Sequence, residues 1–96
     1  MKPSQALDLN RAEVKAVIAR YSVRNPRLFG SAATGQDHEG SDLDLLVDAL
    51  PGTTLMDLCG LQYELESLLG LPVDVRTPQD LNRRYRDKVL AAAQSL

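Results

Sequence analysis

Asp42 and Asp44 are the residues of this sequence whose type and spacing are best suited to chemistry. They alternate with Leu43 and Leu45, which is the period-two pattern of a β-strand. Both carboxylates therefore point to one face of the strand, about 7 Å apart at a rise of ~3.3 Å per residue, and the leucines point to the other. Two carboxylates at this distance repel each other unless a cation lies between them. Because these ligands are hard oxygens, the pattern favours Mg²⁺ over Zn²⁺.

A third aspartate, Asp74, repeats this pattern on a second predicted strand. Val73 and Val75 flank it and are expected to face the core, so Asp74 shares the face of the first two aspartates if the strands are neighbours. Three carboxylates on one sheet face are a ligand set for two metal ions in phosphoryl chemistry. One ion would orient and polarise a triphosphate, and the other would lower the pKa of an attacking hydroxyl.

Gly30 and Ser31 follow a short predicted strand, Arg27–Phe29, and ten residues separate them from Asp42. A glycine at a strand end lets phosphate oxygens approach the backbone closely. The Ser31 hydroxyl and the amides of the following turn can donate hydrogen bonds to those oxygens. The pair is therefore a candidate phosphate-binding turn.

The elements that must position these residues alternate between helix and strand, without an internal repeat or a linker. Apolar periodicity and turn residues predict a first helix, capped by Asn10 and Glu13 and ended by Asn25-Pro26, followed by the strand at 27–29 and a turn or short helix from Ser31. A strand at 43–47 follows, and then a helix that begins at Thr53 or Thr54 and ends at Gly70. The last predicted elements are a strand at 71–75 and a helix opened by Thr77-Pro78. This order predicts an α/β (α+β) fold, a small mixed sheet flanked by helices.

Composition predicts a single domain that spans residues 1–96. The chain is 44% hydrophobic and 25% charged, with a formal net charge of −2 and one cysteine. This balance does not favour direct nucleic-acid binding, and one cysteine excludes an intrachain disulfide. No apolar run approaches the ~18 residues of a membrane span, and no signal peptide is visible, so we expect a cytoplasmic protein without a membrane partner.

Two stretches, Gly30–Gly35 and Ser41–Val47, together resemble the minimal nucleotidyltransferases. These are small DNA-polymerase-β-like domains that transfer a nucleotide, usually an adenylyl group from ATP. The stretch Leu71–Val75, followed by Thr77-Pro78, resembles the family's third-carboxylate strand. The resemblance extends from about Leu9 to Leu90 and implies a polymerase-β-like nucleotidyltransferase fold.

This resemblance also implies the roles of individual residues. Gly30 and Ser31 match the family's triphosphate contacts, and Ser41 matches the residue before the first aspartate. ATP is the implied co-substrate, and two Mg²⁺ ions are the implied cofactors. The residues that match the metal-binding and catalytic aspartates are Asp42, Asp44 and Asp74.

Many minimal nucleotidyltransferases act as antitoxins beside a small helical ribonuclease toxin of the HEPN class. The resemblance therefore implies a hetero-oligomer in which AMP is attached to a tyrosine of the toxin. In one respect the chain departs from the family, because Thr34 stands where members often carry Arg.

Two alternatives remain open. A catalytically weak relative could neutralise its toxin by binding alone, and the loss of a cation at Thr34 favours that reading. A nucleotidyltransferase acting on an antibiotic or another small alcohol is the other alternative. Such enzymes usually carry a further helical domain for the acceptor, for which this chain has no residues left.

The predicted last helix carries a cluster of cations. Leu81, Tyr85 and Val89 recur every four residues and predict a core stripe, which would turn the cations outward to solvent, to the nucleotide or to a partner. Pairs three or four residues apart share a face, and we expect one pair to reach the nucleotide or the partner. The cations are Arg83, Arg84, Arg86 and Lys88.

Three other residues have simpler interpretations. Asp48 is expected at a solvated strand end, and His38 in an exposed polar loop. Cys59 is expected to be a buried or half-buried residue of the leucine-rich helix. That helix, Leu55–Leu69, has more apolar residues than one core stripe needs, which leaves room for a docking surface.

Overall fold

The computed structural model describes residues 1–96 as a series of helices and strands that alternate through most of the chain. The elements are α1 (Pro3–Leu9), α2 (Arg11–Ala19), β1 (Val23–Phe29), α3 (Ser31–Thr34), β2 (Leu43–Ala49), α4 (Leu55–Leu69), β3 (Val73–Arg76), the 3₁₀ helix η1 (Pro78–Asp80), α5 (Arg83–Ala92) and β4 (Gln94–Ser95). The expected α/β fold class is confirmed. None of the helices is both long enough and apolar enough to cross a membrane.

The strands form one mixed sheet in the order β3-β2-β1-β4. Strand β1 runs antiparallel to β2 and to β4, whereas β2 and β3 are parallel. Parallel neighbours need a crossover connection, and α4 provides it between β2 and β3. The expected mixed sheet is thereby confirmed, and the two aspartate-bearing strands are neighbours.

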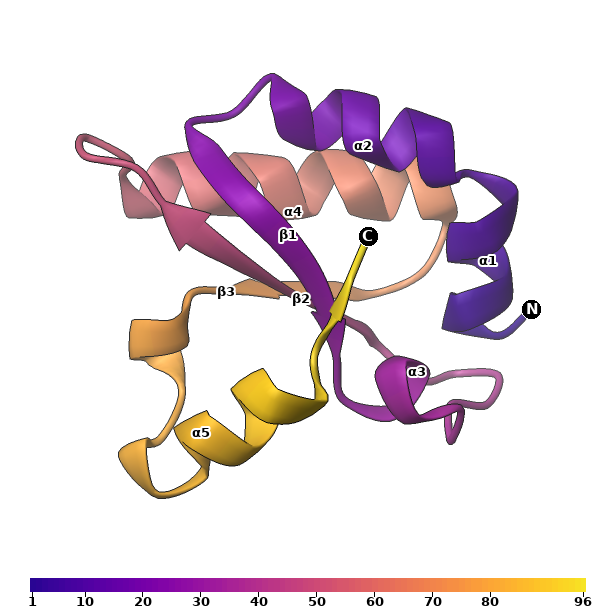
Figure 1. Cartoon of the computed structure of the whole chain (residues 1–96). Coiled ribbons are helices and arrows are strands. Elements are labelled where there is room, and N and C mark those ends of the chain that lie inside the picture. Colours follow the sequence, from indigo (N-terminus) through magenta and orange to yellow (C-terminus); the bar gives the residue numbers. More distant parts are fainter.

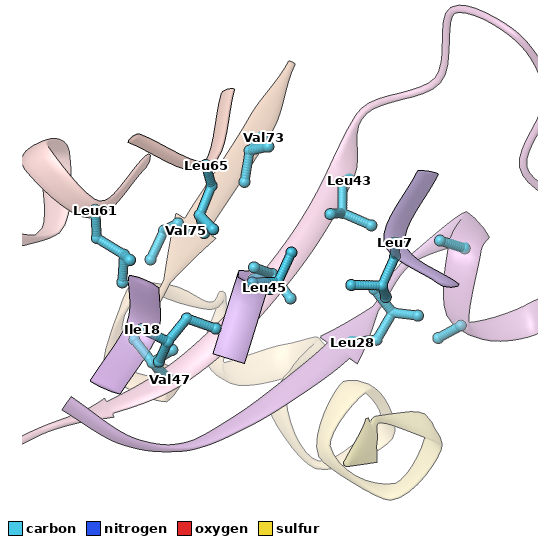
Figure 2. Close-up of a cluster of buried hydrophobic side chains, with 13 residues drawn as sticks. Leu7, Ile18, Leu28, Leu43, Leu45, Val47, Leu61, Leu65, Val73 and Val75 are labelled. Carbon is cyan, nitrogen blue, oxygen red and sulfur yellow. The ribbon is translucent and has the colours of Figure 1, made fainter. Parts of the chain in front are cut away.

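One face of this sheet carries the hydrophobic core. Figure 1 shows α2 and α4 on one side of the sheet and α5 on the other. Leu43, Leu45 and Val47 of β2 are fully buried beneath the helices, as are Leu61 and Leu65 of α4 (Figure 2). The opposite face is covered only in part. Where η1 packs against β2, Leu46 is fully buried, but α5 contains no buried residue.

Helix α4 begins and ends as the sequence predicts. The Thr54 hydroxyl accepts a hydrogen bond from the Asp57 amide at 3.1 Å, and the Asp57 carboxylate accepts one from the Thr54 amide at 2.9 Å. This reciprocal pair is a capping box, which satisfies amides that the first turn leaves free. Gly70 ends the helix in the left-handed conformation at φ 70°, where a side chain would be strained.

The outer surface of α4 differs from the expectation. Cys59 is exposed, so the predicted buried or half-buried position is wrong. Leu61 and Leu65 face the core, whereas other apolar positions of the helix face solvent. Leu55, Met56 and Tyr63 are therefore exposed apolar residues on this helix, each more than 70% accessible.

The N-terminal helical region is longer than expected. Helix α1 precedes Asn10, and α2 begins directly after it. Asn10 does not cap α2 through its side chain, so the predicted capping box with Glu13 is wrong. Its Nδ2 instead donates to the Ala6 carbonyl at 2.8 Å, which satisfies the C-terminal end of α1. This bond to the end of α1 replaces the expected cap of α2, and it is possible because α1 lies directly before Asn10.

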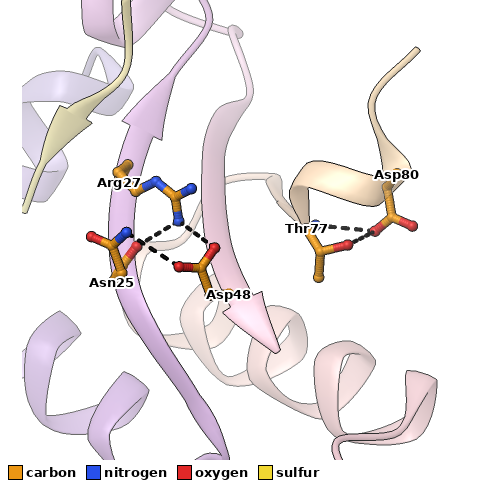
Figure 3. A network of polar contacts seen from close by, with 5 residues as sticks. All are labelled: Asn25, Arg27, Asp48, Thr77 and Asp80. Carbon is orange, nitrogen blue, oxygen red and sulfur yellow. Dashed lines mark hydrogen bonds and ion pairs between the residues drawn. The ribbon is translucent and has the colours of Figure 1, made fainter. Parts of the chain in front are cut away.

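The last helix also begins later than expected. The Thr77 amide and hydroxyl both donate to the Asp80 carboxylate, at 3.0 and 3.1 Å (Figure 3). These bonds close a single 3₁₀ turn that opens at Pro78, after which Leu81 is extended. Helix α5 then begins behind Asn82, whose Oδ1 accepts from the Arg84 amide at 2.9 Å. The predicted helix start at Thr77-Pro78 is therefore wrong.

The core stripe predicted for this helix is also wrong. Leu81 is buried but lies before α5, and Tyr85 is 54% exposed. Strand β4, which follows the helix, pairs with β1 and was not expected. The helix is thus positioned by the chain on either side of it rather than by a buried face of its own.

Strand β1 starts earlier than the predicted 27–29 and contains a bulge. Its register with β2 shifts between Arg24 and Arg27, and Asn25 has a φ of 54°. At this bulge the Arg27 guanidinium donates to the Asn25 carbonyl at 2.8 Å and to Asp48 at 3.1 Å (Figure 3). The side-chain Nδ2 of Asn25 also donates to the Asp48 carboxylate, at 3.2 Å.

Asp48 is therefore not the solvated strand end that the sequence suggested. Burial by itself would raise its pKa, but the hydrogen bonds from Asn25 and Arg27 and the nearby guanidinium charges outweigh burial and lower the pKa. Asp48 is a half-buried partner of Arg27, and Arg27 itself is only 9% exposed.

Candidate active site

The three predicted aspartates lie together at one end of two neighbouring parallel strands. Asp44 of β2 is the register partner of Asp74 of β3, and Asp42 immediately precedes β2 on the same face. On the other face, Leu43 pairs with Val73 and is fully buried. The apolar residues of the two strands thus turn the carboxylates outward, onto the face opposite the core.

Asp44 is the central member of this group. Burial raises its pKa to about 6, and the negative charges of Asp74 and then Asp42 add to the increase, against a smaller opposing effect of Arg76. Like charges at close range disfavour ionisation. The local electrostatics therefore favour either a proton or a bound cation at this position.

Arg76 was not identified by sequence reasoning. Its Nε donates to the Asp74 carboxylate at 2.8 Å, and the two side chains are 48% and 34% exposed. Arg76 lies two residues after Asp74 on β3, so both occupy one face of the strand. That spacing was visible in the sequence and could have revealed the pair. The ion pair places one cation against the Asp74 carboxylate.

The donor set fits Mg²⁺ that shares its ligands with a substrate. No group of three or more His, Cys, Asp or Glu side chains is arranged to hold a metal ion by itself. Mg²⁺ commonly takes only one or two carboxylates and completes its shell with water and phosphate oxygens. Asp42 and Asp44 supply two carboxylates on one face, and the pKa of Asp44 is raised by burial and then by the neighbouring carboxylates.

Gly30 lies directly against this group. Strand β1 ends at Phe29, the register partner of Asp44, and Gly30 follows with a φ of 73°. A Cβ atom at Gly30 would lie 3.1 Å from Asp44 Cγ and would overlap the carboxylate. Position 30 therefore requires glycine for two reasons, its backbone conformation and the space that the Asp44 side chain occupies. Ser31, the first residue of α3, continues the same turn.

The loop between α3 and β2 is fixed by its own hydrogen bonds. The Ser41 hydroxyl accepts from the His38 amide at 3.0 Å, which places Ser41 beside Asp42 as part of a turn. His38 is exposed, as expected. Asp37, which the sequence did not single out, accepts from the Ser4 amide at 2.8 Å, and that bond lowers its pKa despite burial. The loop is thereby anchored to α1.

A pocket of about 480 Å³ opens beside Gly30 and Ser31, between α3 and α5. Lys88 is the only charged residue in its lining. Of the other α5 cations, Arg86 donates to the Leu81 carbonyl at 3.3 Å, and neither Arg83 nor Arg84 lines the pocket. The cations of α5 are therefore not equivalent, and one of them faces the phosphate-binding turn.

Comparisons with known proteins agree with this geometry. The family model described as a nucleotidyltransferase domain matches residues 13–95. The protein adenylyltransferase MntA of Thermococcus cleftensis is 41% identical over 79 residues, which is 82% of this chain and 80% of MntA.

Solved structures give the same fold. A structure assigned to a minimal nucleotidyltransferase superposes with a TM-score of 0.78 at 41% identity, covering 94% of this chain and 93% of that chain. A chain of a toxin–antitoxin complex with AMP-PNP has a TM-score of 0.76 at 22% identity, covering 90% of this chain and 71% of that chain. Since the family model matches most of the chain, and the similar minimal nucleotidyltransferase structure covers nearly all of it, the chain belongs to the nucleotidyltransferase domain family as a minimal nucleotidyltransferase.

Proposed function

We propose that this protein transfers AMP from ATP to a hydroxyl group of a partner protein, with Mg²⁺ as the cofactor. The hydroxyl oxygen forms a bond to the α-phosphorus of ATP, the bond from that phosphorus to the bridging β-oxygen breaks, and pyrophosphate leaves. The hydroxyl proton passes to a base on the protein or to solvent. The observation that carries this proposal is the placement of Asp42, Asp44 and Asp74 on one sheet face beside Gly30.

The order of the strands suggests how the reactants are arranged. Asp74 lies on the edge strand β3, Asp44 lies on β2, and Gly30 follows β1. In an in-line displacement, the attacking and leaving oxygens lie on opposite sides of the phosphorus. The triphosphate would lie toward Gly30 and Ser31, and the acceptor hydroxyl would approach from the β3 side.

The aspartates then have separate roles. Asp42 and Asp44 would hold both Mg²⁺ ions, and Asp74 would complete the second site and help to accept the hydroxyl proton. Bound Mg²⁺ would polarise the phosphates and lower the pKa of the hydroxyl. Arg76 offsets part of the negative charge of Asp74 through the 2.8 Å bond to its carboxylate. Most of the catalytic effect is positioning and charge neutralisation, which a small domain can provide.

The acceptor we propose is a tyrosine of a HEPN-class toxin, for which this protein would be the cytoplasmic antitoxin. Two relatives support the choice. MntA, at 41% identity, is a protein adenylyltransferase, and the similar fold with AMP-PNP occurs in a toxin–antitoxin complex. A hydrophobic surface for such a partner exists on α4, where Leu55, Met56 and Tyr63 are exposed.

A second candidate is neutralisation by binding alone. The ion pair of Asp74 with Arg76 favours it, because this cation already occupies part of the carboxylate's ligand capacity. The two candidates differ in whether the partner becomes covalently labelled.

The test is transfer of label from α-³²P-ATP to the proposed HEPN-class partner toxin, with purified proteins and Mg²⁺. We expect labelled toxin that loses its ribonuclease activity, and mass spectrometry should find AMP joined to a tyrosine oxygen by a phosphodiester bond. Asp42→Asn and Asp44→Asn should abolish labelling, because each removes one negative charge from the metal face and keeps the side-chain shape.

A matched control is Asp8→Asn on α1, which removes an exposed carboxylate that belongs neither to the aspartate group nor to the α4 surface. It should label the toxin normally. Inactivation of the toxin by the Asp42 and Asp44 variants without labelling would favour binding alone. Labelling at the wild-type rate by either variant would contradict the metal assignment.

A further inference from the structure

Five of the ten residues that line the pocket between α3 and α5 are hydrophobic, and the other five include the Gly30-Ser31 turn and one cation. At about 480 Å³ the pocket lies within the range of roughly 300–1,000 Å³ that is usual for small-molecule sites. One wall is the turn at Gly30, Ser31 and Thr34, with two hydroxyl groups. Tyr85 and Lys88 of α5 line the other wall, and Lys88 is the only charged residue of the whole lining.

The geometry of α5 explains why Lys88 faces this turn. Tyr85, Lys88 and Val89 are spaced at i, i+3 and i+4, so they share one face of the helix. The end of the helix is fixed beside α3, because Gln94 Nε2 donates to the Ala33 carbonyl at 2.6 Å and β4 pairs with β1. Lys88 therefore belongs to a wall whose place is set by the sheet.

Electrostatics determine the direction in which a triphosphate can extend from the aspartates. The Asp44 carboxylate occupies the space beside Gly30 that a Cβ atom would need, and Gly30 also lines the pocket. A triphosphate carries about four negative charges, and its terminal phosphates are repelled by carboxylates and attracted by cations. None of the three aspartates lines the pocket that begins at Gly30, and its lining contains one positive charge, that of Lys88.

We propose that Lys88 is a nucleotide-binding residue that neutralises the terminal phosphates of ATP from across the Gly30-Ser31 turn. This inference rests on the proposed function and adds a residue that the aspartate and glycine motifs do not include. A lysine acts here as a mobile point charge on a flexible stem, which can follow the phosphates as pyrophosphate leaves. Thr34, on the facing wall, is too short and uncharged to supply this charge itself.

The first experiment measures ATP affinity in Mg²⁺ by calorimetry for Lys88→Gln, Lys88→Arg and Arg83→Gln. A lost contact to a charged phosphate should weaken ATP binding by about tenfold to a hundredfold in Lys88→Gln. Lys88→Arg should retain most of the affinity. Arg83→Gln removes the same charge from the same helix outside the pocket and should change the affinity less than about twofold, since a solvated charge contributes little.

A comparison of AMP with ATP isolates the contribution of the terminal phosphates, because AMP lacks them. In competition with ATP, AMP should bind the Lys88→Gln variant as well as it binds the wild type. An equal loss for AMP and ATP would mean that Lys88 supports the whole site rather than the terminal phosphates, and would overturn the proposal.

A second-site charge tests the geometry. Because Thr34 lines the pocket opposite Lys88, Thr34→Arg should restore ATP affinity in the Lys88→Gln background. ATP affinity that is unchanged in Lys88→Gln would overturn the proposal for Lys88 and leave the aspartate mechanism intact, provided that the wild type binds ATP and labels its toxin. A wild type that does neither would instead contradict the proposed function.

Discussion

On β2, the side chains of Leu43, Leu45 and Val47 are fully buried against α2 and α4, whereas Asp44 on the opposite face is only partly covered. Successive residues of one strand thus serve two environments. The apolar face removes surface from water and stabilises the fold. On the acidic face, burial raises the pKa of Asp44 to about 6, and the charges of Asp74 and Asp42 add to this, so the ionised Asp44 opposes folding at neutral pH.

The difference between the two faces teaches how a small domain can hold a reactive site. The helices and the apolar face provide stability, so the other face can concentrate carboxylates that would be unfavourable without a cation. Substitutions should therefore have opposite consequences on the two faces. Truncation of a buried leucine on the core face should destabilise the protein, whereas neutralisation of Asp42 or Asp44 on the acidic face should leave it folded or stabilise it.

The largest effect on stability is expected for Leu45→Ala. Leu45 is fully buried, and truncation of such a leucine leaves a cavity that costs about 2–5 kcal/mol. Urea denaturation should show this loss in the free energy of unfolding. Leu55→Ala is the matched control, because Leu55 is 76% exposed, and it should cost less than about 0.5 kcal/mol. Equal costs at the two positions would contradict the assignment of faces.

The next effect is a pH-dependent stabilisation by Asp44→Asn in the absence of metal. The folded pKa of about 6 exceeds the ordinary value of 3.8, so the folded state holds the proton more tightly than the unfolded state. The contribution of Asp44 to stability is therefore complete below pH 3.8 and is lost as the pH rises through 6. The difference between these pKa values corresponds to about 3 kcal/mol.

Melting temperatures in EDTA should therefore diverge with pH. Asp44→Asn should melt close to the wild type at about pH 4 and above it at pH 8, where the wild-type carboxylate is ionised. Mg²⁺ with a non-hydrolysable ATP analogue should raise the melting temperature of the wild type and not that of the variant. A variant that is less stable than the wild type at pH 8 would show that the Asp44 charge is compensated within the fold.

A smaller effect is expected from Asp74→Asn on nucleotide binding. Asp74 lies on edge strand β3, away from the Gly30 turn, and serves the acceptor hydroxyl in the proposed mechanism. ATP affinity in Mg²⁺ should change less than about tenfold, or ~1.4 kcal/mol, while transfer to the toxin is lost. Parallel loss of ATP binding and transfer would instead make Asp74 a ligand of the nucleotide site.

Sequence reasoning was successful where local signals and tertiary structure agree. The alternation in β2 and the valines around Asp74 predicted both faces of the sheet, and the Thr54 cap and Gly70 predicted the ends of α4. These features depend on periodicity and on hydrogen bonds within a few residues.

The errors occur where distant parts of the chain decide the outcome. Tyr85 and Val89 have the spacing of a core stripe, but no element covers them, and they line a pocket instead. Strand β4 exists only through its pairing with β1, because two residues carry no periodic signal. Asn10 is a good helix cap by type, but α1 supplies a competing acceptor at Ala6.

The smallest effect on stability is expected for Arg76→Gln, which removes the one cation that pairs with the acidic face at Asp74. Because both partners are substantially exposed, the ion pair contributes only about 0.2–1 kcal/mol to stability. Removal of the cation leaves the carboxylates with more uncompensated negative charge, so the binding of Mg²⁺ alone should become tighter. Titration of the melting temperature with Mg²⁺ measures both effects, with Arg83→Gln as the control for a loss of charge elsewhere. Weaker Mg²⁺ binding in Arg76→Gln would mean that the guanidinium is needed to hold Asp74 in the ligand position. The acidic face would then depend on a fixed side-chain contact, as the core face depends on the packing of its leucines.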